Sequence, residues 1–229
     1  MSLSRLDGIV FDLDATLVNL GGFIEWRKAH EEIVKNYIAQ ECNPSIVEAC
    51  SAKGLFNMLD EMYAHLQKEK GIVKAREIQN SVYDILGSYE EIGVDSCTLM
   101  DGCVETLDWI KERSIPMGIC TSNSPKSAEA SLNLQGIREY FQVVVGRMID
   151  LPMKPHPAQL QLCFKQLKVN PVNCIMVGDS HKDIIAGKKV SAYTVGVPVY
   201  FTRLELMKEA GVDIIIENLS KLPKVIRSL

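Results

Sequence analysis

Six apolar runs of strand length organise this sequence, and each ends in small or acidic residues. The runs are continuous rather than alternating, which is typical of strands buried on both faces of a sheet. Helical patterns separate them, and strands that alternate with helices indicate a parallel sheet. We therefore predict an α/β fold, a doubly wound parallel sheet. The predicted strands cover Gly8–Phe11, Met117–Cys120, Val143–Val145, Cys174–Val177, Tyr193–Val197 and Asp213–Ile216.

The segment 19–99 interrupts this alternation, because it shows no pattern typical of a strand. Its apolar residues recur every three or four positions, as at Leu55, Met58, Leu59 and Met62, and this spacing predicts amphipathic helices. The segment holds 8 basic and 13 acidic residues, which we interpret as a solvated helical surface. We predict an α/β core formed by residues 1–18 and 100–229, and an all-helical insert at 19–99.

Charge and composition exclude several classes of protein. The 25 basic and 29 acidic side chains leave a net charge of −4, so the chain is not a basic nucleic-acid binder. No apolar stretch approaches the roughly 20 residues that cross a bilayer, and the start of the chain lacks a secretory pattern. The seven cysteines are scattered and odd in number, which is typical of a reducing compartment. We expect a cytoplasmic protein, and the sequence makes no prediction of oligomeric state.

Two carboxylates follow the first predicted strand, in Phe11-Asp12-Leu13-Asp14. Side chains two positions apart on a strand point the same way, so Asp12 and Asp14 are expected at the carboxyl end of the sheet, where open parallel sheets bind ligands. Adjacent carboxylates repel each other unless a divalent cation neutralises them or one is protonated. An alternative is that these residues only begin a turn by accepting nearby backbone N–H groups.

Four stretches in order resemble the motifs of the haloacid dehalogenase-like hydrolase superfamily. Phe11–Val18 resembles the first motif, Asp-x-Asp-x-Thr, although Ala15 replaces the usual glycine. Thr121-Ser-Asn-Ser resembles the second, Lys154-Pro-His-Pro the third, and Gly178-Asp-Ser-x-x-Asp the fourth. Each also has a local interpretation: Ser124 as a helix N-cap before Pro125, Lys154 as a solvated charge, and Ser180 with Asp183 as a capping box. The helical insert resembles the cap of the phosphoglycolate phosphatase and β-phosphoglucomutase branch.

The resemblance implies a site that transfers a phosphoryl group with the help of Mg²⁺. Asp12 would be the nucleophile, and Asp14 the general acid and then the general base. Thr121, Lys154 and the backbone N–H groups of Ser122 or Asn123 would bind the phosphoryl oxygens. The implied metal ligands are the Asp12 carboxylate, the Asp14 carbonyl, Asp179, and Asp183 either through water or as an orienting group.

Several functions remain open at this point. The first hypothesis is a Mg²⁺-dependent phosphatase acting on a small phosphorylated metabolite, such as phosphoglycolate or a sugar or nucleotide monophosphate, through an aspartyl phosphate. The alternatives are a phosphomutase of the β-phosphoglucomutase type, a metal-independent haloacid dehalogenase and a non-catalytic binding module. Arg27 and Lys53 of the insert could reach an anionic substrate, although exposed positions are the default for both. His156 and His181 fall in motif loops.

Overall fold

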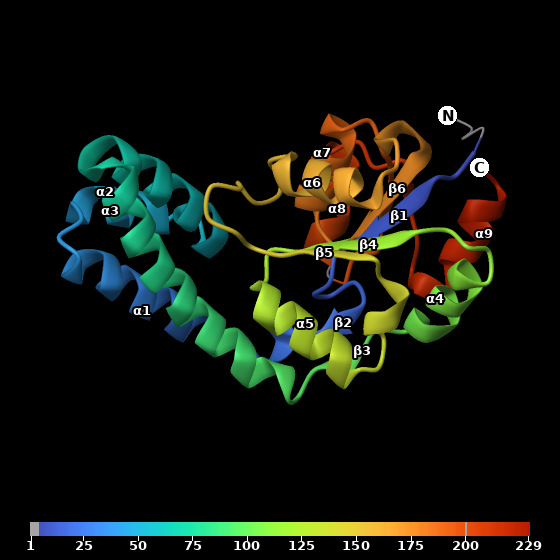
Figure 1. Cartoon of the computed structure of the whole chain (residues 1–229), viewed down its shortest axis with the longest axis horizontal. Helices are drawn as coiled ribbons and strands as arrows, with labels where there is room; N and C mark the ends of the chain where they lie inside the picture. Colours follow the sequence, from blue (N-terminus) through green and yellow to red (C-terminus); the bar gives the residue numbers. More distant parts are fainter. Residues whose placement is uncertain (1–4, 200) are drawn as a thin grey trace.

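The structure is a computed structural model that describes residues 5–199 and 201–229 (Figure 1). The strands are β1 (Gly8–Phe11), β2 (Val18–Asn19), β3 (Thr98–Leu99), β4 (Met117–Cys120), β5 (Val143–Val145), β6 (Cys174–Gly178), β7 (Tyr193–Gly196) and β8 (Ile214–Ile215). The α-helices are α1 (Trp26–Ala39), α2 (Pro44–Ser51), α3 (Leu55–Val94), α4 (Cys103–Lys111), α5 (Pro125–Leu134), α6 (Ala158–Leu167), α7 (His181–Lys189), α8 (Phe201–Glu209) and α9 (Leu222–Arg227). Short 3-10 helices cover Gly21–Phe23, Arg138–Tyr140, Pro171–Asn173 and Leu219–Lys221.

Within the described residues, six strands form one parallel sheet in the order β5-β4-β1-β6-β7-β8. The first strand lies inside the sheet, with Ile9 opposite Met117 of β4 and Ile175 of β6. The six predicted strands are therefore confirmed. β8 is shorter than the run Asp213–Ile216 predicts, because Asp213 turns its carboxylate to the Thr194 N–H and hydroxyl instead of extending the strand.

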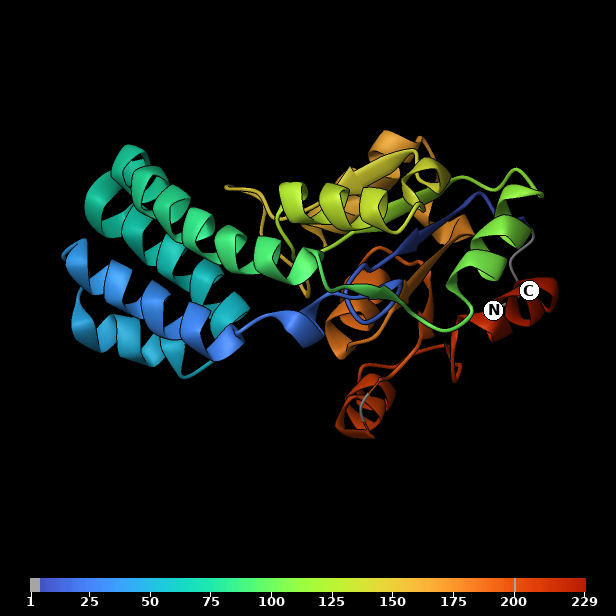
Figure 2. The same ribbon diagram turned by 90° about the horizontal axis from the view of Figure 1, so that it is seen from below.

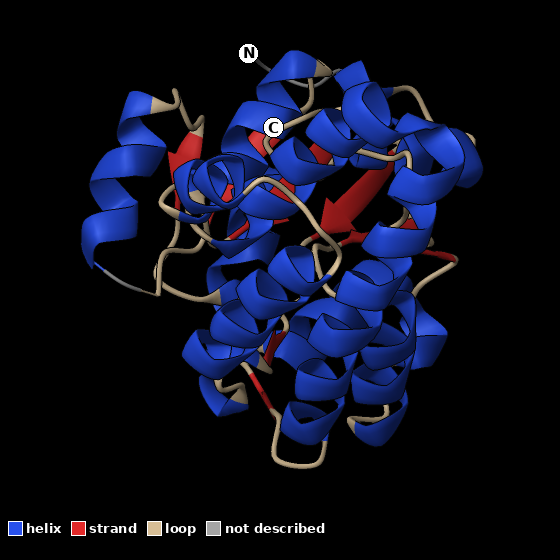
Figure 3. Cartoon of the chain, turned by 90° about the vertical axis from the view of Figure 1, so that its left-hand side faces the viewer, coloured by secondary structure: helices blue, strands red, loops and turns tan. Residues whose placement is uncertain are grey.

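Helices cover both faces of this sheet, as doubly wound topology requires. Ile9 and Phe11 of β1 belong to one apolar cluster with residues of α4, α5 and α9. Val10, which points the opposite way, belongs to a second cluster with residues of α6 and α7. Viewed from the end that carries the insert, helices enclose the strands of the core (Figure 3). The burial of both faces explains why the strand sequences are continuously apolar.

The helical insert forms a separate bundle at one end of the molecule (Figure 2). Helices α1, α2 and α3 bury their own apolar cluster, whose members include Ile33, Tyr37, Met58 and Leu59. Helix α3 is interrupted at Gly71, whose φ of 79° is left-handed, and its second half runs back to the core (Figure 1). The predicted all-helical character is confirmed for this bundle.

A two-stranded antiparallel ribbon, β2 with β3, lies where the insert leaves and rejoins the core. The sequence analysis missed it, because strands of two residues are too short to show a period. Every cysteine of the chain is a buried free thiol. In the described part of the chain, no helix combines the length and apolarity needed to cross a bilayer.

Candidate active site

The loops after β1, β4 and β6 meet at the carboxyl edge of the sheet because these three strands are neighbours. They enclose a cavity of about 310 Å³. Every residue that the sequence analysis assigned to the site lines this cavity: Asp12, Asp14, Thr121, Ser122, Asn123, Lys154, Asp179 and Asp183. The fold therefore brings together residues that are up to 171 positions apart in the chain, from Asp12 to Asp183.

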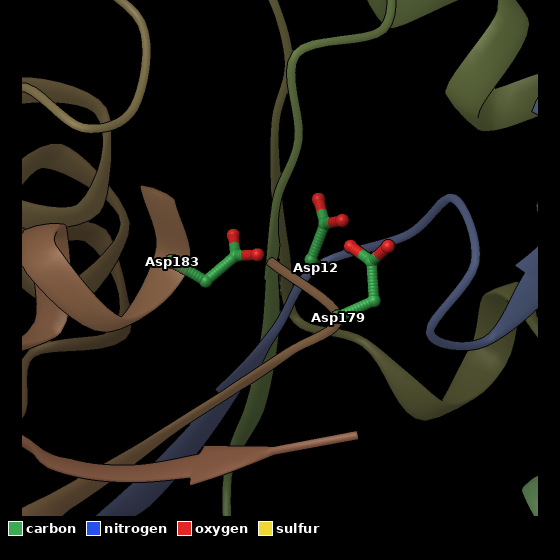
Figure 4. Close-up of side chains that lie close together, drawn as sticks. All are labelled: Asp12, Asp179 and Asp183. Carbon is green, nitrogen blue, oxygen red and sulfur yellow. The ribbon is translucent and has the colours of Figure 1, made fainter. Parts of the chain in front are cut away.

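Three buried carboxylates form a cluster on the floor of the cavity. Asp12, Asp179 and Asp183 each offer an oxygen, and these oxygens lie within 4.8 Å of one another. Figure 4 shows Asp12 between the other two, with the carboxylates turned toward one another. A buried set of hard oxygen donors fits Mg²⁺ or another hard divalent cation and does not suit a soft metal.

Asp183 has two tasks, because its two oxygens face different partners. Its Oδ2 accepts from the Ser180 N–H at 3.0 Å and from the Ser180 hydroxyl at 2.7 Å, and this capping box begins α7. Its Oδ1 faces the cavity, 2.6 Å from Lys154 Nζ. The local and the functional interpretations of the fourth motif therefore hold together, and the capping box fixes the carboxylate within the cluster.

The Lys154 ammonium lies inside this acidic cluster rather than in solvent. Its Nζ donates to Asp12 Oδ1 at 2.7 Å, to Asp183 Oδ1 at 2.6 Å and to the Cys120 carbonyl at 2.7 Å, which uses all three donors of the ammonium. Burial favours the neutral amine, but the two carboxylates prevail and raise the pKa of Lys154. Burial also raises the pKa of Asp12, and the Lys154 ammonium opposes this rise.

Asp14 lines the same cavity but stands outside the carboxylate cluster. Its Oδ1 accepts from the Leu20 N–H at 3.0 Å and the Gly21 N–H at 2.7 Å. A side chain at position 21 would not fit, since a Cβ there would lie 2.3 Å from Asp14 Oδ2. Burial raises the pKa of Asp14, against these backbone hydrogen bonds, which favours a carboxyl group that exchanges a proton. If Asp14 binds a metal ion, its backbone carbonyl oxygen would therefore be the ligand, and its side chain would not.

The second motif forms a loop over Thr121–Ser124, which we call the phosphate loop. The Thr121 hydroxyl donates to Asn123 Oδ1 at 2.9 Å and accepts from the Asn123 N–H at 3.2 Å. Ser124 then caps α5, accepting from the Ser127 N–H at 3.1 Å, with Pro125 as the first helical residue. The predicted N-cap is confirmed. Thr121, Ser122 and Asn123 line the cavity, whereas Ser124 and the start of α5 lie behind it.

The sequence analysis missed four residues that surround the upper part of the cavity. Trp26 and Phe56 come from the insert and pack edge to face, with ring centroids 5.7 Å apart. Lys182 and Arg203 come from α7 and α8, and Arg203 forms an ion pair with Asp179. Lys182 occupies a variable position of the fourth motif, so no pattern in the sequence distinguished it from a surface lysine.

The cationic residues of the insert that the sequence singled out lie elsewhere. Arg27 pairs with Glu31, and Lys53 pairs with Glu61, both in exposed positions outside the cavity. The surface interpretation is therefore the right one for both. Of the two histidines in the motif loops, His181 lines the cavity, whereas His156 accepts from the Ala158 N–H at 3.2 Å and lies outside it.

Comparison with known proteins places these features in a family. The sequence pattern of the family described as haloacid dehalogenase-like hydrolase matches residues 9–197. The pyrophosphatase PpaX of Oceanobacillus iheyensis is 26% identical over 220 residues, covering 95% of each chain. A predicted phosphoglycolate phosphatase from Haemophilus somnus has a similar fold, with a TM-score of 0.62 at 19% identity, and the alignment covers 98% of this chain and 100% of the other. A β-phosphoglucomutase from Clostridium difficile also gives 0.62 at 19% identity, covering 98% and 97%.

The turn between Asp14 and Thr16 places a non-glycine residue in a left-handed conformation. Ala15 has a φ of 61°, and its N–H donates to the Val18 carbonyl at 2.7 Å, which closes the turn. The left-handed conformation costs an L-residue about 1–2 kcal/mol, whereas glycine adopts it freely.

We predict that Ala15→Gly raises the free energy of unfolding by about 0.5–1 kcal/mol. The relief of the left-handed conformation outweighs the 0.4–1 kcal/mol that glycine costs through the unfolded chain. Urea denaturation of both proteins measures the difference. Ala64→Gly, on an exposed position inside α3, is the matched control and should destabilise by about 1 kcal/mol. A loss of stability in Ala15→Gly would show that the turn does not strain its alanine.

Proposed function

The chain belongs to the haloacid dehalogenase-like hydrolases, and we propose that it is a Mg²⁺-dependent phosphatase that hydrolyses a small phosphorylated metabolite. One observation carries this proposal: Asp12 lies in a cluster of three buried carboxylates and faces the same cavity as a second, separately held carboxylate, Asp14. A nucleophile and a proton donor that face one cavity are the parts that ester hydrolysis through a covalent intermediate requires.

In the first half of the proposed reaction, an Asp12 oxygen attacks phosphorus and forms an aspartyl phosphate. The phosphorus–oxygen bond to the leaving group breaks, and Asp14 gives its proton to the departing oxygen. In the second half, water attacks the same phosphorus while Asp14 takes a proton from it. Phosphate then leaves and Asp12 is regenerated. The raised pKa of Asp14 supports its role as the proton donor.

The cation site and the phosphate loop would neutralise charge during both halves. When bound, Mg²⁺ would offset the repulsion between the phosphoryl oxygens and the Asp12 carboxylate. Asp12, Asp179 and the Asp14 carbonyl would hold it, with Asp183 bound through water or orienting the other groups. The N–H group of Ser122 or Asn123 would donate to the phosphoryl oxygens, as would the Thr121 hydroxyl after it turns away from Asn123 Oδ1. The loss of one such donor costs about 3 kcal/mol. Lys154 would supply positive charge beside the nucleophile.

The upper part of the cavity supports a substrate whose leaving group carries a second negative charge. The Lys182 ammonium is half-buried and lies 3.3 Å from Asn57 Oδ1 and 6.0 Å from the centre of the Phe56 ring. The charges of Asp183 and Asp60 act on this ammonium, and it donates a hydrogen bond to the neutral Asn57 side chain. Burial lowers the pKa of Lys182, and a bound anion would stabilise the charged form of its ammonium. The names pyrophosphatase and phosphoglycolate phosphatase, carried by similar proteins, describe substrates of this kind.

We predict that Asp12→Asn abolishes hydrolysis of p-nitrophenyl phosphate, because the change removes the attacking charge and keeps the size. The wild-type rate should also require Mg²⁺ and disappear in EDTA. Asp84→Asn, at an exposed position of α3, is the control and should keep the full rate. Wild-type turnover by Asp12→Asn would remove the proposed nucleophile.

We predict that Lys182→Met raises the KM for phosphoglycolate and pyrophosphate by roughly 10- to 100-fold. This is the range expected for loss of a charge-assisted hydrogen bond. The KM for p-nitrophenyl phosphate, whose leaving group carries no second anion at the start of the reaction, should change little. Steady-state kinetics with the three substrates, and with exposed Lys126→Met as control, measure the effect. An equal rise for all three substrates would contradict a role in recognising the leaving group.

A further inference from the structure

A buried ion pair joins the helical insert to the core behind the phosphate loop. Arg147 follows β5, and Glu90 lies near the end of α3, 57 positions earlier. Arg147 Nη1 lies 2.7 Å from Glu90 Oε1, and Nη2 lies 3.3 Å from Oε2. Their side chains are 1% and 0% exposed, so the pair has almost no contact with water. Neither residue lines the cavity, so neither touches the substrate directly.

The same two residues hold the backbone of the phosphate loop at three consecutive positions. Arg147 Nη1 donates to the Ser122 carbonyl at 2.7 Å, and the Arg147 N–H donates to the Asn123 carbonyl at 2.8 Å. Glu90 Oε2 accepts from the Ser124 N–H at 2.8 Å. These contacts fix the orientation of the peptide groups on both sides of Asn123. The Ser122 carbonyl belongs to the peptide that carries the Asn123 N–H, and a hydrogen bond to one end of a peptide polarises the other.

Two residues of one helix of the insert contact the Arg147 guanidinium. Glu90 and Tyr83 both belong to α3, and the guanidinium carbon of Arg147 lies 4.9 Å from the centre of the Tyr83 ring. A buried ion pair gains little over well-packed apolar residues, because desolvation of both charges offsets their attraction. An apolar pair could neither donate to the Ser122 carbonyl nor accept from the Ser124 N–H. The charged pair therefore supplies hydrogen bonds to the loop that an apolar pair would lack.

We propose that Glu90 and Arg147 are positioning residues that make phosphate binding depend on the placement of α3. The inference rests on the proposed function, in which the loop binds the phosphoryl group. A shift of α3 relative to the core would move Glu90, and with it the Ser124 N–H and the guanidinium that holds the Ser122 carbonyl. The insert then acts on the phosphoryl end of the substrate as well as on the leaving group.

The test uses two mild variants of the whole chain, Arg147→Lys and Glu90→Gln. A lysine keeps the positive charge beside Glu90, but a single ammonium does not reproduce the fork that reaches Glu90 and the Ser122 carbonyl together. A glutamine keeps the shape and loses the charge. The probes are inorganic phosphate and orthovanadate as inhibitors of p-nitrophenyl phosphate hydrolysis, with the Mg²⁺ dependence and the melting temperature measured in parallel.

We expect both inhibition constants and the KM to rise about tenfold in each variant, while the Mg²⁺ concentration for half-maximal rate stays within about twofold. The matched controls are Glu91→Gln and Lys126→Met, which remove an exposed ion pair, 2.8 Å long, that joins α3 to α5 one residue further along α3. These controls should leave all constants unchanged. A role confined to stability would lower the melting temperature and leave phosphate inhibition as in the wild type.

The outcomes separate the two proposals. An active wild type whose variants keep normal phosphate and vanadate inhibition overturns the positioning role alone. A wild type that hydrolyses no phosphate ester overturns the proposed function, and the positioning role with it. A selective rise in the phosphate constants supports both.

Discussion

The charge balance around the Lys154 ammonium is the constraint on which the rest of the site depends. Three carboxylates lie buried together at the edge of the sheet. Without positive charge among them, their mutual repulsion would separate them or would favour protonation of at least one. Lys154 contacts two of them and is itself held by the Cys120 carbonyl, so its position is determined by β1, β4 and α7 at once. This placement is possible only because β1 lies between β4 and β6, where the three loops reach a common point. A divalent cation would add to the neutralisation that the Lys154 ammonium and the Arg203 guanidinium begin.

Features encoded by consecutive residues could be predicted from the sequence, whereas features made by distant partners could not. The strand runs, the Ser124 cap and the Ser180–Asp183 capping box depend on neighbours within a few positions, and the structure confirms them. The residues that line the cavity were predicted from the resemblance of four ordered motifs to those of the family, each placed after a predicted strand. The motif order pointed to Lys154 as a site residue, but its local sequence alone is that of a solvated loop lysine, because its burial depends on residues up to 142 positions away. The Glu90–Arg147 pair and Lys182 show no pattern in the sequence either, because their partners are also distant along the chain.

The insert contacts two loops of the candidate site through residues near the two ends of α3. Beyond the Glu90 contact with the phosphate loop, Asp60 Oδ2 accepts from the Met153 N–H at 3.0 Å, one residue before Lys154. Tyr63 and Arg76 of the same helix contact Asp150, which lies in the loop between β5 and Lys154. The loop that carries Lys154 and the loop over Thr121–Ser124 therefore both contact α3, on opposite sides of its interruption at Gly71. Under the proposed function, these contacts would link the selection of the leaving group to the alignment of the phosphoryl group.

The central claim is that Asp12 carries the phosphoryl group during turnover, and trapping the intermediate tests it most directly. Asp14→Asn with p-nitrophenyl phosphate and Mg²⁺ is the best case, since nitrophenolate leaves without a proton and only the hydrolysis of the intermediate needs the missing base. Rapid acid quenching followed by borohydride reduction converts an aspartyl phosphate to homoserine, which peptide mass spectrometry locates. The account predicts homoserine at position 12, absent when substrate or Mg²⁺ is omitted. An unmodified Asp12 under turnover, or homoserine at another aspartate, would contradict it.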